Sequence, residues 1–580
     1  MIFAENISFS FPQKDLFNNV SFTLENGQHC AFIGSSGSGK TTMADIIMNP
    51  DKYMFDGKLE IDPTYKIGYV SQFPNINRND TTSVFEFLGE VFIECENEIT
   101  RICAKMESGE NIEKLMEDYQ DALDRFDALG GSDYESNILK KLALAELTSL
   151  KDQTVASLSG GEFKLLQIMK EMLLNPDLII MDEPDAFLDF ENMNALKNLI
   201  INHKGTLLVI THNRYLLNHC FDKIMHLENK ELQEFDGTYV DYNLSLLNKK
   251  IELQELSIAD DLEIERNELL ITRLRKIATL NSEAARGKAL KARVKIQERL
   301  LARRIKAPFV RINKPKINLI TDNEVADDIA LKVTDHSITY DETIIDNVNF
   351  EIGSRDKVAI VGINGSGKTS MLKDIYRNDS PSIVLGENIC PVYLSQLHDE
   401  ILDDNSKVVE EFRDLNFEGS RAIRAYLRRF GFNKDIGSQK VSSLSGGEKN
   451  ILQLAKISAN STNMLLLDEP TSHLDTYSQI ALEEAIQAYN GTILMVSHDY
   501  YTIVNSMDYV LLIENKTIRK MTIKKFKRMI YKKHFDRDYL EFEAKKKSIE
   551  TRIELALNNR DFESAKKVID SLEELIKEFN

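Results

Sequence analysis

The chain has 580 residues and a mass of 66.3 kDa, which is too long for a single domain. Apolar residues make up 42% of it and charged residues 28%, and no stretch approaches the ~20 apolar residues that cross a bilayer. The N-terminus lacks the basic start and apolar run of a signal peptide, so we expect neither a membrane-spanning nor a secreted protein. The five cysteines form no metal-binding spacing, which fits reduced thiols in a cytoplasmic protein.

The positive charge is concentrated, although the formal net charge is −20. Residues 266–316 carry 16 Lys/Arg and three acids, and residues 515–535 carry nine Lys/Arg and no acid. Two basic segments on an acidic chain indicate local contact with a polyanion such as RNA. The alternative for each segment is a solvated basic helix.

Four motifs occur twice and indicate a duplicated domain. GSSGSGKT at 34–41 returns as GINGSGKT at 362–369, and LSGGE occurs at 158–162 and at 444–448. An apolar run before Asp-Glu-Pro and a later Ser/Thr-His pair also repeat. From LSGGE onward the repeats are offset by 286 residues, but Gln72 and Gln396 are offset by 324. The first repeat therefore carries 38 extra residues between its glutamine and its LSGGE.

The pattern predicts the elements in chain order. His29–Ile33 and Lys357–Val361 are predicted as short buried strands that lead into the glycine-rich turns, with helices from Thr41 and Thr369. The inserted segment, within about 83–147, alternates apolar and acidic residues at helical spacing and predicts an acidic helical hairpin. Residues 239–315 predict a long exposed helical hairpin with its turn near 278–282, and residues 536–580 predict another amphipathic helical pair.

The glycine-rich segments are typical of phosphate-binding loops. Backbone N–H groups surround the β-phosphate at a helix N-terminus, the lysine reaches the β/γ oxygens, and the hydroxyl joins Mg²⁺. The first repeat offers Gly34, Ser35, Gly37, Ser38, Gly39, Lys40, Thr41 and Thr42 for ATP. The second offers Gly362, Asn364, Gly365, Ser366, Gly367, Lys368, Thr369 and Ser370.

Acidic pairs follow two apolar strands. Asp182 and Asp468 end these strands, a position from which a carboxylate reaches the shell of Mg²⁺. Glu183 and Glu469 come next and can orient or deprotonate the attacking water, unless the pairs are solvated caps. A histidine follows each glutamate by 29 residues and either contacts the γ-phosphate or belongs to the core; these are His212 and His498.

Together the motifs resemble tandem ABC-type ATPase domains, which form a head-to-tail sandwich around two ATP molecules. The resemblance implies one site from Lys40, Thr41, Gln72, Asp182, Glu183 and His212 with Ser445, Gly446 and Gly447 of the other repeat. It implies a second site from Lys368, Thr369, Gln396, Asp468, Glu469 and His498 with Ser159, Gly160 and Gly161. The implied Mg²⁺ ligands are Thr41, Gln72, Asp182, Thr369, Gln396 and Asp468. Phe11 and Tyr340 lie where the family stacks an aromatic ring on adenine, or they are core residues.

Two fused ABC domains with a long helical linker resemble the ABC-F proteins, most of all the antibiotic-resistance ribosomal protection group. The resemblance implies an α/β fold with ATPase domains at 1–238 and 317–520, an arm within 83–147, a basic linker at 239–316 and a helical extension at 521–580. ABC-F proteins occupy the tRNA exit site of the ribosome, with the linker directed toward the peptidyl-transferase centre. The implied partners are therefore the 70S ribosome, its 23S rRNA and the P-site tRNA. The resemblance also implies a monomer whose two ATPase domains form the sandwich within one chain.

Residues within the linker are the candidates for these contacts. Arg286, Lys288, Lys291 and Arg293 are the candidate RNA-binding residues, and Ile277 and Leu280 lie near the predicted tip. The segment after the first acidic pair, Asp185 to Asp189, departs from the usual Thr-Asn-His-Leu-Asp of ABC-F, whereas Thr471 to Asp475 departs only at Ser472. This departure puts equal turnover of the two sites in question.

Three classes of function are compatible with the sequence. The leading class is a ribosome-bound ATPase that protects the large subunit from antibiotics or, in a general form, relieves stalled translation. The second is a nucleic-acid repair ATPase like the Uup-type members, suggested by the C-terminal helical pair. The third is an ATPase motor for a separate membrane transporter, which needs no basic linker of this length.

Overall fold

The computed structural model describes residues 1–11, 14–72, 81–107, 112–186, 188–249, 328–340, 342–395, 400–415, 417–433, 435–460, 462–534 and 561–579, with short pieces between 250 and 327 and between 535 and 560. The chain divides into two compact units. The first comprises Met1–Asp236 and Asn313–His534, and the second comprises Gly237–Ile312 and Phe535–Asn580. None of the helices described is both long and apolar enough to cross a membrane.

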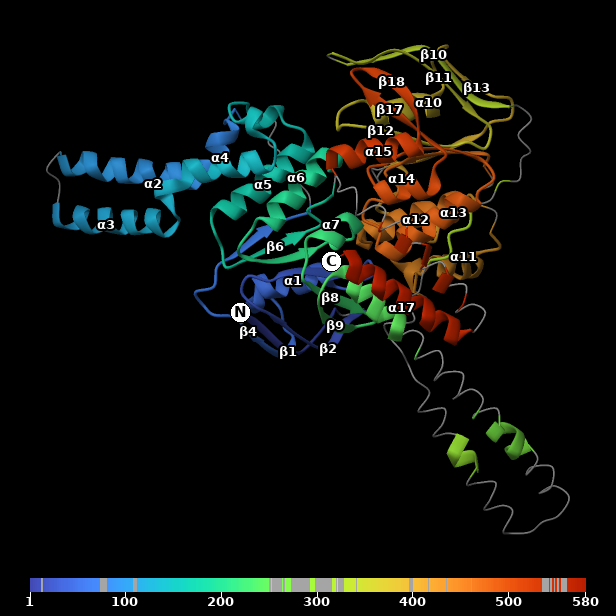
Figure 1. The fold of residues 1–580 in the computed structure, drawn as a ribbon, viewed down its shortest axis with the longest axis horizontal. Coiled ribbons are helices and arrows are strands. Elements are labelled where there is room, and N and C mark those ends of the chain that lie inside the picture. The colour runs from blue at the N-terminus through green and yellow to red at the C-terminus, as the bar shows by residue number, and fades with distance from the viewer. Residues whose placement is uncertain are drawn as a thin grey trace. The chain divides into compact units, whose positions relative to one another are not determined.

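The first repeat is built on a six-stranded sheet with the order β5-β6-β7-β3-β8-β9 (Figure 1). Its strands are β3 (His29–Ile33), β5 (Ile67–Val70), β6 (Leu178–Asp182), β7 (Thr206–Ile210), β8 (Lys223–Glu228) and β9 (Glu231–Asp236). Neighbouring strands are parallel except β9, which runs antiparallel to β8. Every residue of β6 and β7 is buried, as expected for central strands of a parallel sheet that is covered on both faces.

The second repeat has the same sheet, with the order β14-β15-β16-β12-β17-β18. Its strands are β12 (Lys357–Gly362), β14 (Pro391–Leu394), β15 (Met464–Asp468), β16 (Thr492–Val496), β17 (Tyr509–Glu514) and β18 (Thr517–Thr522). Each repeat adds a three-stranded antiparallel sheet, β2-β1-β4 in the first and β11-β10-β13 in the second. These strands are β1 (Ile2–Phe11), β2 (Lys14–Leu24), β4 (Asp56–Glu60), β10 (Ile329–Thr339), β11 (Thr343–Gly353) and β13 (Ile383–Leu385). The predicted α/β fold with two ABC-type domains is confirmed.

Helices connect and cover the sheets. In the first repeat they are α1 (Lys40–Met48), α5 (Gly160–Leu173), α6 (Phe190–Ile201) and α7 (Arg214–His219). In the second they are α10 (Lys368–Arg377), α11 (Ser420–Leu427), α12 (Gly446–Ser458), α13 (Thr476–Ala488), α14 (Tyr500–Ser506) and α15 (Ile523–His534). The core of each repeat joins the parallel sheet, the antiparallel sheet and the first helix, with Phe17 and Phe32 fully buried in the first. This packing holds the loop between strand and first helix in place.

The inserted residues of the first repeat form helices. The segment contains α2 (Val84–Glu107), α3 (Ile112–Ala128) and α4 (Tyr134–Leu144). An isolated β-bridge joins Ser83, just before the insertion, to Thr154, and its counterpart in the second repeat joins Lys407 to Lys440. Helix α4 begins 286 residues before α11, so these two helices are also equivalent. The extra residues are therefore those of α2 and α3, which lie side by side and extend away from the sheet (Figure 1).

The basic segment 515–535 contributes to the first compact unit. It forms β18 and α15, and Phe526 of α15 is fully buried. The ring of Phe526 lies 6.0 Å from that of Phe190 and 6.4 Å from that of Tyr500. The compact unit thus continues to His534, whereas the sequence-based division starts a separate extension at residue 521.

The second unit is helical in its described parts. The amide nitrogen of Asn267 donates to Gln297 Oε1 at 2.6 Å and to the carbonyl oxygen of Arg293 at 3.2 Å, so two helical pieces of the linker lie side by side. Helix α17 (Phe562–Phe579) buries an apolar stripe at a spacing of three or four residues, which includes Ile569, Leu572 and Ile576. Arg293 is exposed, whereas Arg286, Lys288, Lys291, Ile277 and Leu280 lie outside the described residues.

Candidate nucleotide sites

The two glycine-rich loops have matching geometry. Each follows a buried strand and ends in a glycine with positive φ at the helix N-cap, 107° at Gly39 and 91° at Gly367, a conformation that favours glycine. Lys40 Nζ donates to the carbonyl oxygens of Gly34 and Ser35 at 2.9 and 3.1 Å, and Lys368 makes the equivalent bonds. Burial lowers the pKa of both lysines, although nearby carboxylates oppose the shift. The ammonium groups thus point into their own loops.

The residues beside each loop fit Mg²⁺. Thr369 Oγ1 donates to Asp468 Oδ1 at 3.1 Å, and a hydrogen bond likewise joins the side chains of Thr41 and Asp182. Burial, with the neighbouring Glu183, raises the pKa of Asp182 to about 6, and burial also raises the pKa of Asp468. A hydroxyl and a carboxylate are the hard oxygen donors that Mg²⁺ prefers, and a cation would offset the cost of burying the acid.

Each loop also contains a buried serine hydroxyl that makes no hydrogen bond to the described residues. Within the described part of the chain, Ser38 Oγ and Ser366 Oγ have no partner. A buried polar atom without a partner is costly, and a phosphate oxygen would satisfy it. The loops therefore fit a polyphosphate in both repeats.

The glutamates that follow the acidic strands adopt strained backbone conformations. Their φ angles are 44° at Glu183 and 47° at Glu469, in the left-handed region that non-glycine residues rarely adopt. Their N–H groups donate to the carbonyl oxygens of Ile210 and Val496 at 2.9 and 3.0 Å. Such strain costs about 1–3 kcal/mol and persists where the surrounding structure holds it, often at functional sites.

Glu183 is surrounded by polar partners. Its Oε2 atom accepts from Gln72 Nε2 at 2.5 Å and lies 2.9 Å from Nδ1 of His473, which belongs to the second repeat. Burial alone would raise the pKa of Glu183, but His473, His212 and Lys40 lower it to about 2. Gln72 is itself held in place, because the buried Lys164 donates to its carbonyl oxygen at 2.9 Å.

Among the residues described, Glu469 has fewer hydrogen-bond partners than Glu183. Its Oε2 atom accepts from the N–H of His498 at 3.3 Å, and among described residues its Oε1 atom makes no hydrogen bond. Burial raises the pKa of Glu469 to about 8. The Phe190 ring of the first repeat packs edge-on against the His498 ring, at 5.9 Å between centroids. Gln396, the expected partner, lies outside the described residues.

His212 is buried, His498 is largely buried, and both are neutral at pH 7. Burial, together with Lys40, lowers the pKa of His212 to about 4, and burial with Lys368 lowers the pKa of His498 well below its usual value. In the described structure neither ring nitrogen of His498 has a hydrogen-bond partner. A neutral imidazole with an unmade bond can donate to a phosphate oxygen.

Both LSGGE motifs start helices through the same cap. Ser159 and Ser445 are N-caps of α5 and α12, and each forms a capping box with the glutamate three residues later. The helix N-terminus presents backbone N–H groups and a partial positive charge, which suits an anion.

The structure brings each LSGGE motif to the glycine-rich loop of the other repeat. Ser445 Oγ lies 3.0 Å from Ser36 Oγ, and a Cβ built on Gly161 would lie 3.4 Å from Asn364 Nδ2. Two aspartates make equivalent bonds across the repeats: Asp475 accepts from the N–H of Ser36 at 3.2 Å, and Asp189 accepts from the N–H of Asn364 at 3.1 Å. These paired contacts relate the repeats head to tail.

One contact between the repeats is an ion pair whose arginine is replaced by a tyrosine at the equivalent position. The guanidinium of Arg214 forms ion pairs with Glu483 and Asp499 of the second repeat and lies over the ring of Tyr501 at 4.6 Å. Arg214 and Glu483 side chains are 13% and 8% exposed, so this pair is largely screened from solvent. The residue 286 positions after Arg214 is Tyr500.

The two candidate adenine-stacking residues are exposed. Phe11 is 47% exposed at the end of β1, and Tyr340 is 66% exposed, with its hydroxyl 3.1 Å from Ser370 Oγ. The alternative that they are core residues is therefore wrong. Exposed rings near the loops remain available to a flat ligand.

Sequence reasoning missed several residues of these sites, namely Ser36, Lys164, Asp189, Arg214, His473 and Asp475. The two aspartates could have been found, because they end the same motif in both repeats. The contacts of His473 and Arg214 carry no signal in the sequence pattern, because their partners lie more than 250 residues away.

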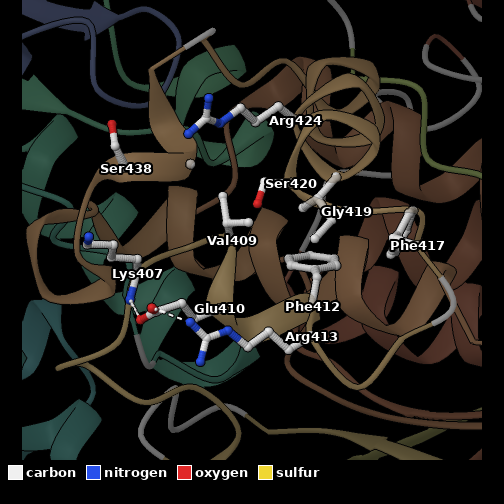
Figure 2. Close-up of a pocket in the computed structure, with 12 residues that line it drawn as sticks. Lys407, Val409, Glu410, Phe412, Arg413, Phe417, Gly419, Ser420, Arg424 and Ser438 are labelled. Carbon is white, nitrogen blue, oxygen red and sulfur yellow. Dashed lines mark hydrogen bonds and ion pairs between the residues drawn. The ribbon is translucent and has the colours of Figure 1, made fainter.

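A pocket of about 370 Å³ lies in the second repeat, away from the predicted nucleotide residues (Figure 2). Its lining combines apolar side chains such as Val409 and Phe412 with cationic ones such as Arg424. The first repeat has Tyr134 where the second has Ser420 in the pocket wall, and Phe92 of α2 stacks on Tyr134 at 4.9 Å. The insertion thus packs against the equivalent position in the first repeat.

Comparison with known proteins agrees with this geometry. The ABC transporter family profile matches residues 17–186 and 345–472, just over half of the chain. Among solved structures, RNase-L Inhibitor has a TM-score of 0.55 at 17% identity and covers 91% of this chain and 92% of its own. An archaeal ribosome recycling factor, aABCE1, solved with the ribosomal stalk protein aP1, has a TM-score of 0.54 at 18% identity and covers 90% and 92%. The fold and the paired sites are those of an ABC-type ATPase with two nucleotide-binding domains.

Relatives with similar sequences define the family. ABC transporter F family member 2 of Arabidopsis thaliana is 31% identical over 536 residues, 87% of this chain and 75% of the relative. The uncharacterized ABC transporter ATP-binding protein YfmM of Bacillus subtilis is 30% identical over 515 residues, 86% of this chain and 96% of the relative. The energy-dependent translational throttle protein EttA of Escherichia coli K12 is 29% identical, covering 86% and 89%. The chain belongs to the ABC-F family of ATPases.

Proposed function

We propose that this protein is a cytoplasmic ATPase that binds the 70S ribosome and acts on translation. The observation that carries the proposal is the similarity, over 86% of the chain, to EttA, whose name describes an energy-dependent throttle of translation. The basic linker supports it, because binding to RNA is dominated by phosphate contacts. ATP would close the two repeats on each other and hydrolysis would release them, which couples nucleotide state to binding.

The side chains have complementary roles in this hydrolysis. Lys40 and Lys368 bind the phosphates, and the signature serines and glycines contact the γ-phosphate from the opposite repeat. Asp182 with Thr41, and Asp468 with Thr369, would hold Mg²⁺, which neutralises charge on the phosphates. Glu183 and Glu469 take the proton of the attacking water, and His212 and His498 donate to the γ-phosphate.

In its specific form, the proposal is protection of the large subunit from antibiotics. The protein would bind at the tRNA exit site, contact 23S rRNA and the P-site tRNA, and extend the linker, residues 239–316, toward the peptidyl-transferase centre. Expression in a sensitive host should raise minimum inhibitory concentrations for a subset of drugs that bind the large subunit. A catalytically inactive variant should not raise them. Unchanged values for every drug would contradict the protective role.

A general translation factor is the second candidate, and the name of EttA favours it specifically. Such a factor would restore synthesis on stalled ribosomes without any drug. A stalling reporter measured with and without the protein separates the two roles. A Uup-like repair role would be favoured if the protein did not associate with ribosomes and still bound branched DNA after ribonuclease treatment. That result would contradict both the protective role and the general translation role.

Ribosome binding can be tested through the linker charge. Replacement of Arg286, Lys288, Lys291 and Arg293 by Glu should weaken binding at least about tenfold, because each neutralised phosphate releases counterions. Basal ATPase activity should stay within about twofold. A matched control reverses four exposed lysines of the first repeat, namely Lys52, Lys58, Lys66 and Lys230.

Pelleting with ribosomes over a range of salt concentrations gives the measurement. The proposal expects steep salt dependence in the wild type and loss of binding only in the linker variant. If the linker variant pellets like the wild type, this segment is a solvated basic helix. If the control variant loses binding equally, total charge and not the linker determines association.

A further inference from the structure

His473 of the second repeat contacts the glutamate of the first site. Its Nδ1 atom lies 2.9 Å from Glu183 Oε2 and 2.9 Å from Gln72 Nε2. We propose that His473 is a positioning residue that orients the Glu183 carboxylate from the opposite repeat, and that the two sites hydrolyse ATP at different rates because the equivalent position in the sequence is Phe187. The inference rests on the proposed role of Glu183 in hydrolysis.

The loop that carries His473 is held in place on both sides. Before it, Asn450 Nδ2 donates to the carbonyl oxygen of Ser472 at 2.6 Å. After it, Asp475 caps α13 through the N–H of Ser478 at 2.8 Å and accepts from the N–H of Ser36 in the first repeat. His473 itself adopts a positive φ of 59°, which these anchors maintain. A side chain on such a rigid loop can fix its partner's orientation.

The two hydrogen bonds at Glu183 define the orientation of the carboxylate. Gln72 donates to Oε2, and His473 donates to the same atom when its Nδ1 carries the proton. In that tautomer the Gln72 and His473 nitrogens, 2.9 Å apart, are both donors and make no hydrogen bond with each other. With Oε2 engaged twice, Oε1 is the oxygen left to accept a proton from water. Fixing this geometry reduces the reorganisation that hydrolysis requires.

The second site has a different residue at the equivalent position. The offset of 286 residues assigns Phe187 to this position, and a phenyl ring cannot donate a hydrogen bond. Phe187 and Gln396 both lie outside the described residues. Among those described, Glu469 Oε2 accepts from the N–H of His498 at 3.3 Å, and Oε1 lies 3.7 Å from His498 Nε2, beyond hydrogen-bond distance. The paired contacts of Asp189 and Asp475 show that the two loops occupy equivalent places otherwise.

Single-site backgrounds provide the test. Glu469→Gln leaves hydrolysis to the first site, and Glu183→Gln leaves it to the second. Into each background we would introduce His473→Phe, which copies the residue of the first repeat, and His473→Asn, whose amide nitrogen can replace Nδ1. Steady-state kcat and KM, and single-turnover release of phosphate from labelled ATP, are measured for each variant, and thermal unfolding checks that each is folded.

The expected pattern is specific to one site. In the Glu469→Gln background, His473→Phe should lower the hydrolysis rate at least about tenfold with KM within about twofold, and His473→Asn should recover most of the rate. In the Glu183→Gln background, the same substitutions should change the rate by less than about twofold. Equal losses in both backgrounds would mean that His473 only supports the loop and would overturn the proposal.

Two further outcomes are also decisive. In the Glu469→Gln background, an unchanged rate for His473→Phe would overturn the positioning role. The same holds if the Glu469→Gln variant, with His473 intact, completes no single turnover. If Glu183→Gln together with Glu469→Gln hydrolyses ATP like the wild type, the assignment of the glutamates fails first. In that case the proposed hydrolysis mechanism is wrong, and the positioning role of His473 fails with it.

Discussion

Glu183 and Glu469 follow equivalent strands and share the same strained backbone, but their side chains meet different neighbours. Around Glu183 lie an amide and an imidazole, the latter supplied by the second repeat. Among the residues that the structure describes around Glu469, the backbone N–H of His498 donates to its carboxylate, the His498 ring lies 3.7 Å away, and the aromatic ring of Phe190 packs against that histidine. Two repeats with the same motifs therefore build chemically different sites.

The difference appears in the protonation states of the two acids. A pKa of about 2 leaves Glu183 ionised at neutral pH, whereas a pKa of about 8 leaves most of Glu469 protonated. A protonated carboxyl group cannot take a proton from water, so the described surroundings favour proton transfer to Glu183 over transfer to Glu469. Conservation of motif between repeats does not ensure equal chemistry.

The largest expected effect is the loss of hydrolysis when both glutamates are replaced. Glu183→Gln with Glu469→Gln should lower the ATPase rate by about 10²–10⁴-fold, because an amide cannot accept the proton, while ATP binding is retained. Among single variants, Glu183→Gln should remove the larger share of activity. Phosphate release and nucleotide binding measured side by side check both points. A larger loss from Glu469→Gln would reverse the comparison between the sites.

A smaller effect is expected at Arg214, whose equivalent position in the second repeat is Tyr500. Arg214→Met leaves the buried carboxylate of Glu483 and the partly buried carboxylate of Asp499 without their cation, which should destabilise the molecule by about 3–5 kcal/mol. Urea unfolding followed by circular dichroism measures the change, since the chain has no tryptophan.

A second substitution separates the ion pair from packing at Arg214. Adding Glu483→Gln removes one of the two stranded charges and can keep the contacts of residue 483 with Thr502 and Asn505. The double variant should therefore recover part of the loss. If Arg214→Met alone unfolds like the wild type, the ion pair does not stabilise the association of the repeats.

The sequence pattern was sufficient to predict those parts of the fold that depend on neighbouring residues in the chain. Strands such as Leu178–Asp182 are uninterrupted apolar runs, so both their burial and the acid at their end could be predicted. The cap of each signature helix is also local, because Ser159 and Glu162 are three residues apart. The residues of the glycine-rich loops and of the acidic pairs could be predicted from such local patterns.

Contacts between the repeats could not be predicted in the same way. Glu183 and His473 are 290 residues apart, and only the head-to-tail arrangement brings them together. The resemblance to ABC ATPases implied that arrangement, but side chains that differ between the repeats, such as Arg214, follow no shared motif. The partner of such a residue depends on the folded surface of the other repeat.

The smallest expected effect concerns a buried histidine that the second repeat replaces by tyrosine. His203 is 8% exposed, its Nε2 atom has no partner among described residues, and burial together with Lys141 and His29 lowers its pKa to about 4. The unfolded chain binds a proton near pH 6.5 whereas the folded chain resists it until about pH 4, so stability should fall as the pH drops through this range. Its counterpart, Tyr489, donates its hydroxyl to the carbonyl oxygen of Thr462 at 2.6 Å and carries no such dependence.

Replacing this histidine should therefore make the first repeat less sensitive to acid. Between pH 7 and pH 5, His203→Gln should reduce the loss of stability by about 1 kcal/mol, or about 2–4 °C in Tm, after allowance for partial solvation of the ring. Calorimetry of the wild type and the variant at both pH values makes the measurement, with His29→Gln as a matched control for removing a nearby imidazole. If the variant and the wild type lose the same stability on acidification, His203 takes up its proton as readily in the folded chain as in the unfolded one. The difference between His203 and Tyr489 would then have no consequence for the pH response of the two repeats.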